Sequence, residues 1–159
     1  MNKQISLAKL VDTQIVACNV RAADRDEVAD KLGKMMVAAG VITSSYITAM
    51  KKVMDDLGPY CVIAPGIALL HAHPQDGVLK PCLGVITLKP PVPFNHSQND
   101  PVEIAFALGA VDKETHISAL AELADQLSRQ EFIQAIKSSN DENELVKIFI
   151  TDLHSRKEK

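Results

Sequence analysis

Nearly continuous apolar runs in the middle of the chain constrain its fold more than any other feature. Four of them lie between residues 60 and 110, at Tyr60–Ala64, Ile67–Leu70, Leu83–Leu88 and Val102–Ala110. Short apolar runs bounded by glycine and proline are typical of buried strands. The last run is long enough for a buried helix, but its flanks favour a strand. We therefore expect a sheet whose strands are covered by other elements.

Segments with helical spacing precede these runs. Asp24 predicts the N-cap of a helix that carries Val28 and Leu32 on its inward face and ends at Gly40. A strand is expected before it at Ile15–Val20, and a second helix after it at Ser45–Asp56.

The C-terminal third is predicted to be helical. Apolar residues with helical spacing occur at Ile117, Leu120, Ala121, Ala124 and Leu127, and further helices are expected at Glu131–Ile136 and from a cap at Asn140 or Asp141 to about Leu153. Three prolines, Pro90, Pro91 and Pro93, are expected to forbid regular structure after the third apolar run. Strands that alternate with helices indicate one α/β domain, and their uneven spacing favours a mixed β-sheet flanked by helices on both faces.

The composition excludes several classes of protein. The chain has 159 residues, 47% hydrophobic and 23% charged, as in an ordinary soluble domain. Its formal net charge is −3 and aromatic residues make up 4%, so neither nucleic-acid binding nor a base-stacking platform is expected. The cysteines, Cys18, Cys61 and Cys82, form no CxxC pair. With no signal-peptide core and no membrane-length apolar run, a cytoplasmic location is expected.

Two histidines follow the second apolar run, where an α/β protein commonly builds a site. His71 comes directly after that run, and His73 precedes Pro74. The ends of strands and the loops beyond them carry functional residues in this class of fold. Histidine in such a place can act as a base, a nucleophile or a metal ligand.

A third histidine is expected to face the same region from a helix. His116 lies on one helical stripe with Leu120, Leu123 and Leu127, in the first turn of its helix. That position faces the sheet, and free backbone N–H groups at a helix start favour an anion such as phosphate.

Two chemistries fit an inward pair of histidines. In the first, His71 is a nucleophile that accepts a phosphoryl group while His116 orients or stabilises it, and no cofactor is needed. In the second, His71 and His73 bind a metal ion together with His116. The chain contains no GxGxxG, Walker A, GxSxG or HExxH motif that would indicate another chemistry.

The segment GPYCVIAPGIALLHAHPQDGV resembles the enzyme IIA domains of the bacterial sugar phosphotransferase system, of the mannitol–fructose type. In that family the motif P/N-G-I-A-x-P-H ends on the histidine that accepts phosphate. The longer stretch LKPPVPFNHSQNDPV resembles the ascorbate-specific branch in particular. The resemblance extends over about residues 6–153 and implies that residues 1–159 form a single domain of this type.

The resemblance implies roles for the histidines and for partner proteins. His71 would be the phosphoryl acceptor, through a tele-phosphohistidine intermediate, and His116 the histidine that supports it. The donor would be phospho-HPr, the acceptor a cysteine-phosphorylated IIB protein, and the IIC permease would be reached only through IIB. The flat apolar surface around Leu69 and Leu70 is expected to dock both soluble partners, and the pair Lys51–Lys52 could dock an acidic one.

The chain departs from the family motif at two positions. Leu70 stands where the family has proline, and His73 stands where an arginine or a small residue is frequent. His73 would thus replace a guanidinium with a weaker, titratable phosphate-binding group. Two other functions remain open: a regulatory IIA-like domain that senses phosphorylation state, and a metal-dependent hydrolase that uses His71 and His73.

Overall fold

The apolar runs form the strands of one sheet, as expected. The computed structural model describes residues 6–157. Its strands are β1 (Val16–Val20), β2 (Val62–Ala64), β3 (Ile67–Leu70), β4 (Cys82–Val92) and β5 (Val102–Gly109). Its α-helices are α1 (Arg25–Ala38), α2 (Ser44–Leu57), α3 (Lys113–Leu127), α4 (Gln130–Ser138) and α5 (Glu142–Lys157). Short 3₁₀ turns connect several of them, including η4 (Pro74–Asp76) just after β3.

The sheet is mixed and has the strand order β1-β4-β5-β3-β2. The pairs β1–β4 and β3–β5 are parallel, while β4–β5 and β2–β3 are antiparallel. Between β2 and β3 the chain reverses at Gly66, whose φ of +74° is readily adopted by glycine alone. The strand that carries His71 at its end, β3, therefore lies inside the sheet, between β5 and β2.

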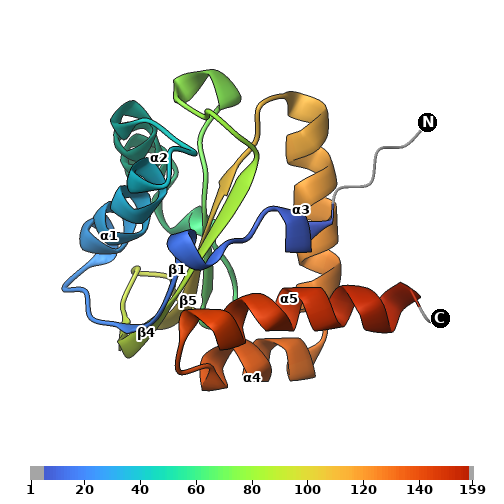
Figure 1. Cartoon of the computed structure of the whole chain (residues 1–159). Helices are drawn as coiled ribbons and strands as arrows, with labels where there is room; N and C mark the ends of the chain where they lie inside the picture. Colours follow the sequence, from blue (N-terminus) through green and yellow to red (C-terminus); the bar gives the residue numbers. More distant parts are fainter. Residues whose placement is uncertain (1–5, 158–159) are drawn as a thin grey trace.

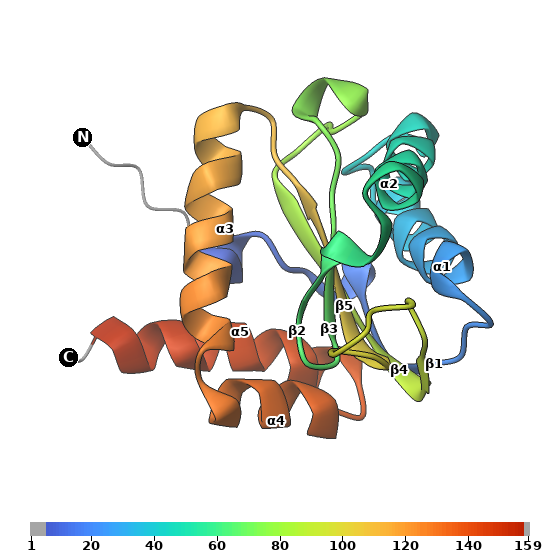
Figure 2. The ribbon, with the colours of Figure 1, turned by 180° about the vertical axis from the view of Figure 1, so that it is seen from behind.

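Helices cover the two faces of the sheet in separate layers. In Figure 1, α1 and α2 lie on one side, and α3, α4 and α5 on the other; Figure 2 shows the same layers from behind. The apolar residues accordingly form two buried clusters, one under α1 and α2 and the other under α3, α4 and α5. This arrangement confirms the expected α/β architecture with helices on both faces.

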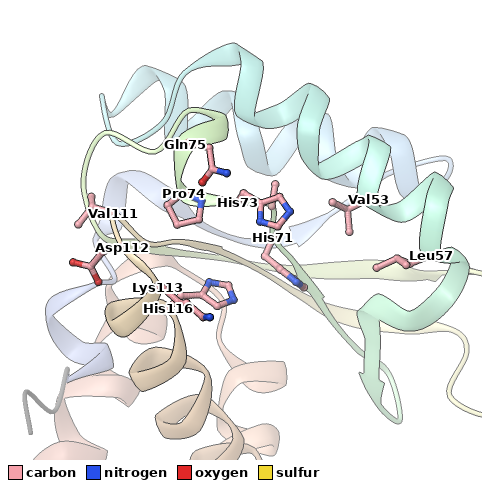
Figure 3. A pocket seen from close by; sticks show the side chains of 11 residues that line it. Val53, Leu57, His71, His73, Pro74, Gln75, Val111, Asp112, Lys113 and His116 are labelled. Atoms are coloured by element: carbon pink, nitrogen blue, oxygen red, sulfur yellow. The ribbon is translucent and has the colours of Figure 1, made fainter.

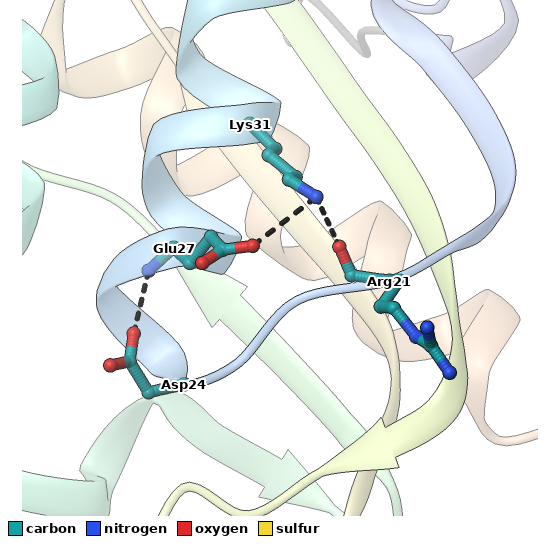
Figure 4. A network of polar contacts seen from close by, with 4 residues as sticks. All are labelled: Arg21, Asp24, Glu27 and Lys31. Atoms are coloured by element: carbon teal, nitrogen blue, oxygen red, sulfur yellow. Dashed lines mark hydrogen bonds and ion pairs between the residues drawn. The ribbon is translucent and has the colours of Figure 1, made fainter.

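The first helix begins where the sequence predicts. The Asp24 side chain accepts a hydrogen bond from the Glu27 N–H at 2.9 Å and thereby caps α1. Lys31 pairs with Glu27 at 3.2 Å and also donates to the Arg21 carbonyl, which ties the helix to the chain that enters it (Figure 4). A matching cap occurs at α5, where Asp141 accepts from the Glu144 N–H at 2.8 Å.

The expectation that prolines end regular structure after Leu88 is wrong. Strand β4 continues to Val92, which pairs with Val102 of β5. The ladder shifts register between Thr87 and Val92, and β1 pairs with β4 only as far as Leu88. The prolines therefore occupy an irregular stretch with one open edge, where a strand needs no donor from them.

Two local expectations are also corrected. Tyr60 lies in a 3₁₀ turn (58–61) and not in β2, because Gly58 and Pro59 turn the chain there. Of the apolar residues with helical spacing on α3, Leu120 and Leu127 pack against the core beside Ala119 and Leu123, whereas Ile117 is 56% exposed. Within residues 6–157, no helix is long and apolar enough to cross a membrane.

Candidate functional site

Strand alternation directs His71 toward α3. Along β3 and just beyond it, Ala68, Leu70 and Ala72 enter the cluster under α1 and α2, whereas Ile67 and Leu69 enter the cluster under α3, α4 and α5. Successive side chains of an extended segment point to opposite faces. His71 continues the odd-numbered series, so its ring projects on the α3 side, at the edge where β3 ends.

His116 meets that ring from α3. The Asp112 side chain caps this helix by accepting from the Thr115 N–H at 2.7 Å, so His116 lies in the first turn. The centroids of the His71 and His116 rings are 5.5 Å apart and the ring planes are tilted by 49°. The structure thus brings His71 and His116 together, as Figure 3 shows. Leu120, Leu123 and Leu127, on the stripe predicted to include His116, pack against the core.

Both rings open into a pocket of about 740 Å³. The pocket lies between α2, the loop after β3 and the start of α3 (Figure 3). Its apolar wall consists of Val53, Leu57, Ala72, Pro74 and Val111, and its polar wall of His71, His73, Gln75, Asp112, Lys113 and His116. A pocket with a few polar groups converging on an apolar wall is the usual form of a binding site.

The two ring nitrogens of His71 differ in environment. Nδ1 is buried and makes no hydrogen bond of ordinary geometry within the described part of the chain, although the Leu69 carbonyl is near enough to act on the His71 ring. Nε2 is therefore the nitrogen through which His71 can reach a group in the pocket. This geometry suits the Nε2 (tele) nitrogen as the reactive atom.

Burial keeps both imidazoles neutral. Desolvation lowers the pKa of His71, and the charge on His73 lowers it further, while the Leu69 backbone carbonyl acts in the opposite direction. Desolvation also lowers the pKa of His116, with smaller contributions from His71 and His73. A neutral ring has a free lone pair, so His71 is in the state that a nucleophile requires.

Acidification is expected to destabilise the fold through these two histidines. The pKa values of both histidines in the folded chain lie below the ordinary value of 6.5. At a pH between the folded and the ordinary pKa, the unfolded chain therefore binds more protons than the folded chain. The free energy of unfolding should therefore fall as the pH drops through 6.5, down to the folded pKa values. Urea unfolding from about pH 7.5 to about pH 5.5 should show a larger loss in the wild type than in a His71→Gln/His116→Gln double variant. Equal losses of unfolding free energy in the wild type and the double variant would contradict the lowered pKa values of His71 and His116.

His73 lies at the mouth of the pocket. Its backbone N–H donates to the Asp76 carboxylate at 3.0 Å, which begins the turn η4. It lines the same pocket as His71 and His116. Among residues 6–151, whose side chains the structure describes, no group of three His, Cys, Asp or Glu residues is arranged to hold a metal ion.

Lys113 also lines the pocket, and the sequence analysis missed it. It precedes His116 by three residues on the first turn of α3, a spacing that places both on one side of the helix (Figure 3). Among the described residues it has no ion-pair partner. In contrast, Lys51 pairs with Asp30 at 2.6 Å and Lys52 with Asp56 at 3.1 Å, so the two lysines expected to dock an acidic partner are paired within the chain.

The expected docking surface is also corrected. Leu69 and Leu70 are only 4% and 1% exposed, because helices cover both faces of β3. Five exposed apolar side chains lie near the site. Leu57 and Val111 line the pocket, Tyr60 and Ile63 line a smaller cavity that also borders His71, and Ile117 follows His116 on α3. We call these five residues the apolar rim.

Comparisons with known proteins show the family and the fold of this chain. Residues 9–151 match the family described as "Phosphoenolpyruvate-dependent sugar phosphotransferase system, EIIA 2". The chain is similar to the ascorbate-specific PTS system EIIA component of Escherichia coli (strain K12), with 45% identity over 82 residues, which are 52% of this chain and 53% of that protein. The match thus spans about half the length of this curated relative.

Solved structures show the same fold. The solution structure of the mannitol-specific cryptic phosphotransferase enzyme IIA CmtB from Escherichia coli has a TM-score of 0.80 and 27% identity, and covers 91% of this chain and 98% of that chain. A complex of enzyme IIA mannitol with phosphorylated enzyme IIB mannitol from Escherichia coli has a TM-score of 0.76 and 20% identity. The match covers 88% of this chain and 96% of that chain. The fold, the match over residues 9–151 and the resemblance stated above agree, and the chain belongs to the sugar phosphotransferase system EIIA type 2 family.

Proposed function

We propose that this chain is a phosphocarrier that accepts a phosphoryl group on Nε2 of His71 from phospho-HPr and passes it to a IIB component. The observation that carries the proposal is the pair of desolvated imidazoles, 5.5 Å apart, in a pocket of a protein of the EIIA type 2 family. In the first transfer the P–N bond of phospho-HPr breaks as a P–N bond forms on Nε2 of His71. In the second transfer that bond breaks as a P–S bond forms on the cysteine thiolate of IIB. The neutral His71 ring supplies the lone pair, and Nδ1 keeps its proton.

The other polar groups of the pocket stabilise the charge of the transferred group. A phosphoryl group in transfer spreads negative charge over its equatorial oxygens, and fixed donors around it lower the barrier. His116 lies on one side of His71 and His73 lies at the mouth of the pocket. Lys113 adds a positive charge that no carboxylate of the described chain neutralises, on the turn where the helix dipole also favours an anion.

The curated relatives suggest the substrate class and the partners. The similarity to ascorbate-specific EIIA components supports ascorbate or a related sugar as the transported compound, with IIC reached only through IIB. Two residues of the apolar rim, Leu57 and Val111, line the pocket, and the rim would be covered in turn by HPr and by IIB. Transient encounters of this kind bury small interfaces, so five exposed apolar side chains are enough for such a contact.

The proposal is tested by reconstitution. The wild type is incubated with enzyme I, HPr and phosphoenolpyruvate and analysed by intact mass. One acid-labile phosphoryl group is expected, and it should be lost on adding an ascorbate-type IIB protein more rapidly than on adding a mannitol-type one. No mass gain would refute the carrier function, and equal loss to both IIB proteins would refute the proposed branch.

Replacing Lys113 with glutamine is expected to slow phosphoryl transfer about tenfold, which corresponds to ~1.4 kcal/mol of transition-state stabilisation. The charge disappears, while glutamine keeps the helix propensity and is only one atom shorter than lysine. The rate is measured by single-turnover transfer from phospho-HPr. Lys34→Gln removes an exposed lysine of α1, on the other helical layer, and should leave the rate unchanged. If the two variants behaved alike, Lys113 would have no role in the site.

A further inference from the structure

A buried tyrosine hydroxyl contacts the backbone next to His71 from the opposite helical layer. Tyr46 of α2 is fully buried, with 0% of its surface exposed. Its hydroxyl accepts a hydrogen bond from the Ala72 N–H at 3.0 Å and donates to the Leu108 carbonyl at 2.7 Å. The Ala72 carbonyl lies farther away, at 3.3 Å, so the single hydroxyl proton goes to Leu108.

This hydroxyl occupies the next position of the β3–β5 ladder. The Gly66 carbonyl accepts from the Ile104 N–H, and Leu70 pairs with Ala107. In that parallel register the next bond would run from the Ala72 N–H directly to the Leu108 carbonyl. The Tyr46 oxygen stands between these two groups and bonds both. The phenol therefore ends direct pairing and holds the chain away from β5 at the residue that follows His71.

The position of this contact ties it to the site. Ala72 belongs to the cluster under α1 and α2, and His71 projects to the other face, where it meets His116. The peptide that joins His71 to Ala72 is thus held from behind by a group that does not enter the pocket. Burial raises the pKa of Tyr46 to about 12, so the hydroxyl keeps its proton and stays a donor to Leu108.

We propose that Tyr46 is a positioning residue for phosphoryl transfer, because its hydroxyl spaces the end of β3 from β5 and thereby sets the His71 ring against His116. The inference rests on the proposed carrier function. Without the hydroxyl, either the Ala72 N–H and the Leu108 carbonyl remain buried and unpaired, or the chain moves toward β5 to pair them directly. The second outcome displaces the backbone that carries His71, and the first leaves that backbone without the hydrogen bond that fixes it.

The test compares two variants that each remove one buried hydroxyl. Tyr46→Phe keeps the ring and removes the bridge. Thr87→Val is the matched control, because the Thr87 hydroxyl also accepts from a backbone N–H, that of Asn19 at 2.8 Å. Thr87 pairs with Ile104, at the end of β5 remote from Leu108. Both variants should unfold at similarly lowered urea concentrations, so a difference in transfer reports on position and not on stability.

Tyr46→Phe should lower kcat for phosphoryl transfer at least tenfold and leave the KM for phospho-HPr unchanged, since the apolar rim is untouched; Thr87→Val should match the wild type. NMR titration should show a His71 pKa closer to 6.5 in Tyr46→Phe than in the wild type, and no such change in Thr87→Val. Rates and titrations of Tyr46→Phe equal to those of Thr87→Val would overturn the inference.

Failure of the carrier function can be distinguished from failure of the positioning role of Tyr46. A wild type that takes up no phosphate would refute that function, while the His71 titration would still test the positioning role. If Tyr46→Phe does not fold, the wild type provides the measurement. Phosphorylation of His71 should then shift the Ala72 amide and the Tyr46 ring resonances and not the Asn19 amide, and the absence of that difference would refute the inference.

Discussion

Replacing His71 with glutamine is expected to abolish phosphoryl uptake completely. Glutamine can form hydrogen bonds at this position but has no nucleophilic nitrogen, so no covalent intermediate can form. With enzyme I, HPr and phosphoenolpyruvate, intact mass should show no phosphorylated species of the variant at times when the wild type is fully modified. This effect should exceed that of any other single substitution in the pocket, because the remaining groups only assist a bond that His71 forms.

His73→Gln is the matched control for this result. His73 lines the same pocket two residues further along the chain. Its variant should still be phosphorylated, at a rate that shows how much a titratable ring contributes at the mouth of the pocket. If phosphate persisted in His71→Gln and disappeared in His73→Gln, the intermediate would be on His73 and the assignment to His71 would be wrong.

Replacing His116 with alanine is expected to give the second largest effect. The variant should still accept phosphate on His71, because the nucleophile is intact, but its onward transfer to IIB should slow about 10²–10³-fold. That range is typical of removing one fixed donor to a developing negative charge. Rapid-quench measurement of transfer from the purified phosphoprotein isolates this step from uptake.

Two further variants sharpen the His116 prediction. His116→Asn retains a donor amide and should recover part of the lost rate. His96→Ala removes a histidine from the loop between β4 and β5, where its Nδ1 accepts the N–H groups of Gln98 and Asn99, and should transfer normally. Normal transfer by His116→Ala would leave that residue with only a packing role beside His71.

Much of the site could be predicted because its determinants are local. The apolar run before His71 indicates a strand end, and the stripe that His116 shares with Leu120 and Leu123 indicates a ring that faces the sheet. The caps at Asp24 and Asp141 depend on bonds to N–H groups three residues away, so a short window of sequence contains them.

The errors concern residues whose environment depends on distant parts of the chain. Leu69 and Leu70 look like an available apolar surface until helices from both ends of the sequence cover them. The prolines after Leu88 look incompatible with a strand until β1 ends beside them and leaves that edge open. Nothing near Lys113 in the sequence shows that it lacks a carboxylate partner and borders the pocket.

The sequence alone determined the apolar strands, the helix starts and the histidines available for phosphoryl chemistry, since each follows from periodicity or from contacts between near neighbours. Only the tertiary structure decided that His71 meets His116 at 5.5 Å, that burial keeps both rings neutral, and that Tyr46 spaces β3 from β5. The physical reason is that distance, desolvation and a bridging hydrogen bond all arise between segments far apart in the chain, and they exist only once the sheet has brought those segments together.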